Sequence, residues 1–246
     1  MNLKGIWAVV YRDILREKKR GIRSLIGMIL SPLLFFIAFG WGLGRNIDIG
    51  GVSYMFFILS GLIAMNGMNT AFSTATTINV ERFYWKTFEE FQVAPISSID
   101  ISIGKIMFGL AKGLAGSAFI YLLGMAFGII LEPNFLFIIS VIINCFMFSA
   151  MALLIAFIVK THQQQGDFNS FIMIPMAFLS GTFFPIDRFP YAFKAISLIL
   201  PLTHSTNCIR AAVLGNSFPY YSFMVVIGYT ILFLIFGIKS VRDLSL

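Results

Sequence analysis

The feature that most constrains this chain is a series of long apolar runs separated by short polar segments. The runs cover residues 24–43, 53–78, 101–131, 135–159, 168–184 and 219–238. A helix needs about 20 apolar residues to cross a hydrocarbon core about 30 Å thick. Because the runs are continuous rather than alternating, they favour helices over the strands of a barrel. We therefore predict an all-α integral membrane protein with six transmembrane helices in a single domain, residues 1–246.

The composition agrees with a membrane protein and argues against a soluble one. Hydrophobic residues make up 58% of the chain and charged residues only 12%, whereas charged residues are about 25% of an average soluble domain. The net charge of +7 does not indicate a nucleic-acid partner, because the basic residues gather at the ends of the apolar runs. In a membrane protein such clusters report orientation.

The distribution of basic residues predicts the topology. With both termini inside, the outer ends of the runs hold only Arg45, Arg188, Lys194 and Arg210. The inner ends hold Lys4, Arg12, Arg16, Lys18, Lys19, Arg20, Arg23, Arg82, Lys86, Lys105, Lys160, Lys239 and Arg242. Since cytoplasmic loops carry the excess of Lys and Arg, we predict a multi-pass protein of the cytoplasmic (inner) membrane with both termini in the cytoplasm.

Residues 3–20 precede the first run and have the pattern of an amphipathic helix. Leu3, Trp7, Val10 and Ile14 follow helical spacing, and the basic residues lie mostly elsewhere on the helix. This pattern predicts an interface helix that lies on the inner membrane surface. A simple positively charged anchor that sets the topology is the alternative.

The loop at 81–96, after the second run, mixes charged and aromatic residues before Pro95 ends any helix. Exposed aromatic residues on the cytoplasmic side need a covering partner. Such a loop is either an interfacial helix on lipid headgroups or a docking site for a soluble subunit, and we favour docking. The candidate docking residues are Glu81, Arg82, Lys86, Thr87, Phe88, Glu89, Glu90 and Pro95.

The second run carries a stripe of polar residues. Asn66, Thr70, Ser73 and Thr77 recur at helical spacing, and Asn69 flanks them. A polar stripe at membrane depth either lines a cavity or hydrogen-bonds a neighbouring helix. Both interpretations stay open, and both are compatible with a path lined by helices.

Lys112 lies within the third run, where a charge is costly. It is expected near the inner boundary, so its long side chain can reach polar surroundings. Alternatively, Lys112 stands at the inner mouth of a path.

The segment at 185–215 is too broken to cross a membrane. Pro185 and Pro190 prevent a continuous helix, Pro201 breaks the chain again, and residues 202–214 are expected to form another short helix that ends at Gly215. We predict two broken outer-leaflet helices between spans five and six, which re-enter the bundle where protein covers their ends. An ordinary outer loop with interfacial helices is the alternative.

These residues resemble ABC transporter permeases of the type-2 exporter class, which serve polysaccharide, nodulation-factor, teichoic-acid and drug export systems. One part of the resemblance lies in the loop after the second run. It consists of Glu81-Arg82, Thr87, Glu89 and Ala94-Pro95-Ile96-Ser97, with Phe91 where the family often has leucine. The most specific part of the resemblance, which we name the outer gate, is Ser180, Gly181, Phe184, Pro185, Pro190, Pro201, His204 and Arg210.

The resemblance implies a mechanism. Two copies of the permease would pair as a homodimer, and two ABC ATPase subunits would bind the loop at 81–96 and hold ATP and Mg. Closure of the ATPases would rearrange the spans, and the outer gate would control exit of an amphipathic drug, lipid or lipid-linked saccharide. The substrate path would include the polar stripe and Lys112.

Other classes of protein fit less well. The sequence has no G-x-x-x-x-G-K-[ST] run, so we expect no ATPase activity and no cofactor in this chain. Cys145, Cys208, His162 and His204 lack zinc-site spacing. A channel or ion-coupled carrier is the alternative function. A membrane enzyme would have to use His204 with Asp187.

Overall fold

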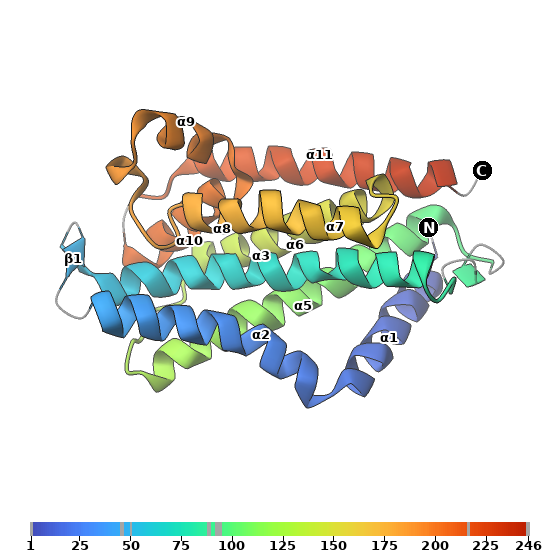
Figure 1. Cartoon of the computed structure of the whole chain (residues 1–246), viewed down its shortest axis with the longest axis horizontal. Coiled ribbons are helices and arrows are strands. Elements are labelled where there is room, and N and C mark those ends of the chain that lie inside the picture. The colour runs from blue at the N-terminus through green and yellow to red at the C-terminus, as the bar shows by residue number, and fades with distance from the viewer. Residues whose placement is uncertain are drawn as a thin grey trace.

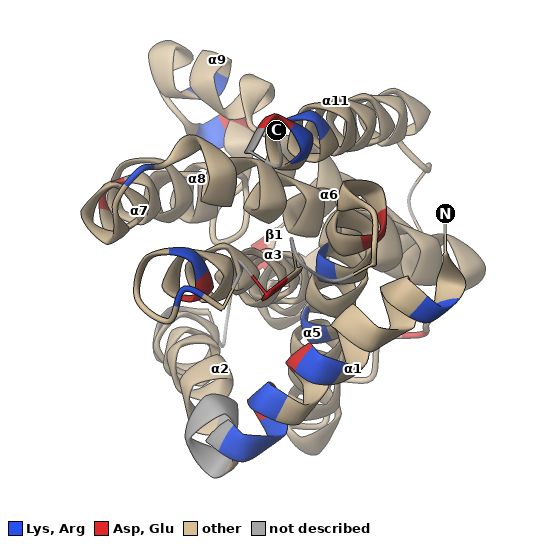
Figure 2. Ribbon diagram, turned by 90° about the vertical axis from the view of Figure 1, so that its right-hand side faces the viewer, with Lys and Arg blue, Asp and Glu red and all other residues tan. Residues whose placement is uncertain are grey.

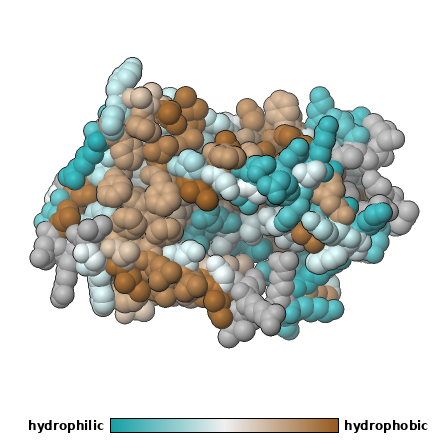
Figure 3. Space-filling view, in the orientation of Figure 1, coloured by the Kyte–Doolittle hydropathy of each residue, from teal (hydrophilic) through white to brown (hydrophobic). Residues whose placement is uncertain are grey.

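The computed structural model describes residues 2–44, 47–49, 51–87, 90–91, 95–215 and 217–244. The chain folds into a bundle of long helices with the two termini at one end (Figure 1). A two-stranded antiparallel hairpin, β1 (Asp48–Ile49) and β2 (Val52–Ser53), lies at the opposite end. Hydrophobic residues cover much of the side of the bundle, and hydrophilic residues gather at the end that carries the termini (Figure 3).

Among the described residues, four helices are long and apolar enough to cross a membrane: α3 (Tyr54–Phe83), α5 (Ser98–Ala126), α6 (Phe135–Ile158) and α11 (Tyr220–Leu244). They correspond to four of the predicted spans and confirm an all-α membrane protein. The other two predicted spans are shorter or interrupted helical segments, so the count of six stays a prediction.

The first predicted span is formed by α2 (Ile22–Phe35) and the π-helical segment η1 (Phe36–Leu43). Pro32 lies inside α2, where it removes a backbone hydrogen bond. The fifth is formed by α7 (His162–Phe168), η2 (Asn169–Met173) and α8 (Ile174–Leu179).

Several predicted boundaries are wrong, and glycine accounts for two of them. The fifth segment ends at Leu179 rather than 184, and the third ends at Ala126 rather than 131. Gly181 and Gly128 follow these ends with φ of 73° and 79°, a left-handed conformation that glycine adopts readily. In contrast, the second helix runs on to Phe83, so Glu81 and Arg82 are helical rather than part of a loop.

Polar caps begin several helices, as the local sequence requires. The Asn2 side chain caps α1 (Leu3–Arg20), which covers the residues predicted as an interface helix; its place on the membrane surface stays a prediction. Ser97 and Asp100 form a reciprocal capping box at the start of α5. The Asp100 carboxylate also accepts a hydrogen bond of 2.9 Å from the Asn2 backbone N–H, which joins the starts of α1 and α5.

The core forms around α3, which is buried along most of its length. Small residues let neighbouring helices approach it and one another closely. Gly113 of α5 faces Cys145 of α6, and Gly67 of α3 faces Ser117 of α5. The Asn144 amide of α6 donates a hydrogen bond of 3.0 Å to the Ala64 carbonyl of α3.

Residues 180–215 form the turn after α8, the short helix η3 (Ile186–Arg188), α9 (Tyr191–Ile199) and α10 (Pro201–Leu214). These helices occupy the segment at 185–215, and their placement as outer-leaflet helices that re-enter the bundle stays a prediction. α10 is mostly buried and packs against α3, α6 and α11. The turn at 180–184 lies against the start of α3, where the Tyr54 hydroxyl donates to the Phe183 carbonyl at 3.0 Å.

A substitution at Gly61 of α3 tests how closely the turn at 180–184 packs against this helix. An added Cβ would lie 2.5 Å from the Thr182 carbonyl oxygen, and backbone cannot rotate away as a side chain can. We expect Gly61→Ala to destabilise the protein by about 1–3 kcal/mol through overpacking. The measurement is the midpoint of thermal aggregation in detergent.

Gly228→Ala on α11 is the matched control, because no atom lies within 4 Å of its added Cβ. It should leave the midpoint unchanged or raise it slightly, since alanine stabilises a helix relative to glycine. Equal midpoints for Gly61→Ala and the parent would contradict the packing described here.

Candidate functional site

The polar stripe of α3 borders a cavity of about 420 Å³, which we name the central cavity. α2 contributes Met28, Ser31 and Phe35 to its wall. All residues predicted to line a substrate path border this cavity: Asn66, Asn69, Thr70, Ser73, Thr77 and Lys112. A polar surface therefore lies between apolar helices inside the bundle.

The stripe residues that border the cavity differ in burial and in their hydrogen bonds. The buried Asn66 amide donates to the Gly116 carbonyl of α5 at 2.8 Å, and the Thr70 hydroxyl donates to the Asn66 carbonyl at 2.6 Å. Asn69 is exposed, and Ser73 and Thr77 are half-buried. Asn66 thus both borders the cavity and bonds a neighbouring helix, so the two interpretations coexist, and a role of the stripe in a substrate path stays a prediction.

A second cavity of about 410 Å³ continues along the other side of the stripe. It shares Asn69 and Ser73 with the central cavity, and its far wall comes from α8 and η2, including Met173 and Phe178. In Figure 3, hydrophilic residues show between hydrophobic flanks near the middle of this face. The α3 stripe is therefore accessible between α2 and α8.

A cluster of buried charges lies at the end of the bundle that carries the termini; we name it the ion cluster. The Lys105 ammonium of α5 lies 2.7 Å from the Asp13 carboxylate of α1 and 2.7 Å from the Glu81 carboxylate of α3. Arg16 of α1 also pairs with Glu81. Asp13, Glu81 and Lys105 are each at most 2% exposed. Burial raises the pKa of the Asp13 carboxyl, and Lys105 opposes that shift.

The ion cluster is joined to the segment that follows α3. The Arg12 guanidinium lies 4.2 Å from the centre of the Phe91 ring and 3.9 Å from the Glu90 carboxylate. The Arg16 guanidinium lies 5.6 Å from the Trp85 ring. Cations over aromatic faces are attracted by the ring quadrupole, so α1 holds both ends of this segment in place.

The predicted docking residues do not share one surface. Glu81 is fully buried in the ion cluster, and Arg82 donates to the Ala156 carbonyl at the end of α6. Lys86, Glu90 and Pro95 are exposed, and Thr87 is half-buried. Phe88 and Glu89 lie outside the described residues.

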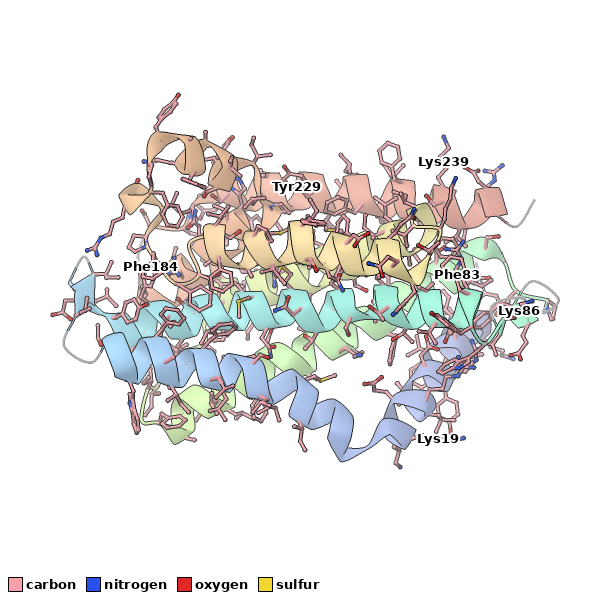
Figure 4. All side chains as sticks on the ribbon, viewed as in Figure 1. Lys19, Phe83, Lys86, Phe184, Tyr229 and Lys239 are labelled. Carbon is pink, nitrogen blue, oxygen red and sulfur yellow. The ribbon has the colours of Figure 1, made fainter. Side chains whose placement is uncertain are left out.

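Two residues that sequence reasoning did not include in the docking site are exposed at the same place. Tyr84 is 65% exposed and Trp85 is 53% exposed. Lys86 follows them with φ of 51°, a conformation uncommon for a residue with a Cβ. The turn after α3 thus presents two exposed aromatic side chains and a cation. Lys86 lies at the end of the bundle (Figure 4). The sequence signal for them was the adjacent pair Tyr84-Trp85 in a charged segment.

Lys112 is neither isolated nor extended into solvent. It is 8% exposed, and its ammonium lies 3.5 Å from the Glu17 carboxylate of α1. The sequence carried a signal for both ion pairs. Asp13 and Glu17 are one helical turn apart on α1, and Lys105 and Lys112 are two turns apart on α5.

The outer gate residues gather at the opposite end of the molecule, where Figure 4 labels Phe184. The Arg210 guanidinium donates to the Gly181 carbonyl at 2.8 Å and to the Phe57 carbonyl at 3.3 Å. It also lies 3.6 Å from the centre of the Phe57 ring. Ser180 is buried. Arg210 therefore ties α10, the turn after α8 and the start of α3 together.

Pro185 and Pro190 flank η3, and Pro201 begins α10. The turn, η3 and α10 are therefore separated by residues that cannot continue a helix. Phe184 is 42% exposed on the turn.

His204 has a packing role in the structure. Its Nε2 donates to the Leu198 carbonyl at 2.9 Å, and its Nδ1 lies 3.2 Å from the Ser222 hydroxyl. Asp187 instead pairs with Lys194 at 2.6 Å. Each member of the pair considered for an enzyme is thus bonded elsewhere. Within the described ranges, no three His, Cys, Asp or Glu side chains are placed to hold a metal ion.

Comparison with known proteins gives consistent matches. The model of the family described as ABC-2 type transporter matches residues 4–214. The chain is 27% identical to Nodulation protein J of Sinorhizobium fredii (strain NBRC 101917 / NGR234), over 97% of this chain and 94% of that protein. It is 26% identical to the inner membrane transport permease YadH of Escherichia coli (strain K12), over 94% of this chain and 91% of that protein.

The ion cluster gives a stability prediction. Lys105→Ala leaves two buried carboxylates without this cation, and breaking a buried ion pair costs about 3–5 kcal/mol. We expect loss of most monodisperse protein in size-exclusion chromatography. Lys194→Ala removes the cation of the exposed pair with Asp187, where the cost is below about 1 kcal/mol. Equal recovery of both variants would contradict a structural role for the cluster.

Cysteine labelling tests the accessibility of the stripe. Cys145 and Cys208 are buried, so the background should be low. We expect Ser73→Cys to react with a water-soluble methanethiosulfonate, because Ser73 borders both cavities. Thr74→Cys should not react, since Thr74 is 2% exposed. The measurement is the mass increase of the intact protein, and equal labelling of the two variants would exclude the described cavity.

Proposed function

Because the chain belongs to the ABC-2 type transporter family, we propose that it is the transmembrane subunit of an ATP-driven exporter. The ATPase activity belongs to a separate partner chain, since this sequence lacks a phosphate-binding loop. The transported molecule is amphipathic: a drug, a lipid or a lipid-linked saccharide. The observation that carries the proposal is the aromatic turn at the end of α3, joined to the buried ion cluster.

The aromatic turn provides the docking surface for the ATPase. Tyr84, Trp85 and Lys86 are exposed, and exposed aromatic residues of this kind are the side chains that most often anchor protein interfaces. Their base is rigid, because Glu81 lies one turn earlier on α3 and is held by Lys105 and Arg16. A push on the turn is thereby passed to α1 and α5.

The proposed topology places this end of the bundle in the cytoplasm. Both termini lie there (Figure 1), and Lys and Arg residues are concentrated along α1 (Figure 2). This matches the excess of basic residues on cytoplasmic segments. The outer gate then faces the outside, and Arg210 links its turn to α3.

A second copy of the chain would complete the path. The polar stripe of α3 is accessible between α2 and α8 through two cavities, and polar surface at membrane depth requires cover by protein or water. In a homodimer these faces would enclose a path between protomers. ATP-driven closure of the two ATPases would shift the spans and open the outer gate.

The test is purification of the tagged chain from its native membrane in mild detergent, with mass spectrometry of the proteins that accompany it. A stoichiometric ATP-binding subunit is the expected result. A preparation without an ATPase, repeated after crosslinking, would contradict the proposal and favour a channel or an ion-coupled carrier.

The docking surface predicts a specific effect on this purification. Trp85→Ala should reduce the accompanying ATPase by about tenfold, because truncation of a central tryptophan removes a large share of interface energy. Trp41→Ala is the control, since Trp41 is similarly exposed (54%) but lies in η1 at the other end of the bundle. Equal ATPase recovery with both variants would show that the aromatic turn is not the docking surface.

A further inference from the structure

Three cavities of the described structure meet at the Glu17 side chain of α1. Glu17 borders the central cavity of about 420 Å³. It also borders a cavity of about 350 Å³ next to Trp85. The third, of about 480 Å³, lies between α1, the start of α2 and α5, and we name it the lateral cavity. Glu17 therefore stands where a path from the side of the molecule joins the polar stripe.

Lys112 and Phe108 form the rest of this junction. Lys112 borders both the central and the lateral cavity. Its ammonium lies 3.5 Å from the Glu17 carboxylate and 5.9 Å from the centre of the Phe108 ring. The ion pair thus occupies the passage between the two cavities.

The lateral cavity combines apolar walls with cations. Ile14, Met28, Phe108, Ala111 and Ala115 provide the apolar surface. Lys18 and Lys112 provide positive charge, and Glu17 is the acidic residue at its border. This combination suits a ligand with an apolar chain and an anionic head.

The Glu17–Lys112 pair is built differently from the ion cluster beside it. Lys105 and its two carboxylates are separated by 2.7 Å and are at most 2% exposed. The Glu17 side chain is 19% exposed, and its separation from Lys112 is 3.5 Å. Because this ion pair is longer and partly hydrated, less interaction free energy is lost when another anion replaces Glu17 beside Lys112.

We infer that Lys112 binds the anionic headgroup of an amphiphile whose apolar chain lies in the lateral cavity. Glu17 is the internal competitor: it holds Lys112 when the site is empty and is displaced when the headgroup arrives. The headgroup then sits at the border of the central cavity. The role of this site in transport rests on the proposed function, whereas the binding itself does not.

The test is native mass spectrometry of the full chain in detergent with phosphatidylglycerol, compared with phosphatidylcholine of the same chain length. The parent protein should bind phosphatidylglycerol preferentially. Lys112→Gln should weaken that binding by about fivefold, the order expected for one partly exposed charge contact. Glu17→Gln should strengthen it, because the competitor is removed. Lys112→Arg should retain it.

Lys239→Gln is the control, because it removes an equal charge from an exposed position on α11 (Figure 4) that lines none of the three cavities. It should leave phosphatidylglycerol binding unchanged. If Lys112→Gln is not recovered as folded protein, the increase with Glu17→Gln decides the question.

Two results would overturn the inference. One is equal binding of the two lipids with no effect of Lys112→Gln. The other is weaker binding in both Glu17→Gln and Lys112→Gln, which marks the pair as structural. These measurements use the chain alone, so they are independent of whether an ATPase accompanies it. If one does, ATP-driven movement of labelled phosphatidylglycerol in vesicles separates a transported amphiphile from a resident lipid, and either source satisfies the inference.

Discussion

The end of the molecule that carries the termini depends on one buried ammonium group, that of Lys105, which is held 2.7 Å from each of two carboxylates. A buried charge without partners costs several kcal/mol, so Asp13 and Glu81 must stay where Lys105 can reach them. This requirement fixes the surface helix α1 against α3 and α5. Because Arg12 and Arg16 of α1 hold Phe91 and Trp85, it also fixes the segment through which we propose that an ATPase acts.

Charged side chains also join helices elsewhere in the molecule, but their contacts differ in length and burial from those of the ion cluster. At the end opposite the termini, Arg210 donates to the carbonyls of Gly181 and Phe57 and so holds the turn after α8 against α3. Between the two ends, the looser pair of Glu17 and Lys112 separates the lateral cavity from the polar stripe. A tight cluster transmits movement, while a partly hydrated pair can exchange partners. The arrangement therefore suits a protein whose ends are rigid and whose interior passage opens.

Sequence reasoning succeeded where the hydropathy and periodicity of a single segment are enough to predict its structure. The apolar runs predicted the long helices, the start of the chain predicted α1, and the resemblance to type-2 ABC permeases is confirmed by the family match. It failed at helix ends, where glycines at 128 and 181 stop the helices early. It also assigned Glu81 to a docking surface, because nothing in the local pattern shows that Lys105 lies opposite it. The roles of the stripe and of the outer gate in transport stay predictions.

The sequence by itself determined that this is a helical membrane protein of the ABC-2 type transporter family and that one face of α3 is polar. Those properties follow from residue order, because hydropathy and helical periodicity are local. Only the tertiary structure decided which acid meets which lysine, and that the polar stripe borders a cavity while Asn66 also bonds α5. The physical reason is that α1 supplies Asp13 and Glu17 to helices far away in the chain, and that pairing is set by packing between helices rather than by the pattern within any one of them.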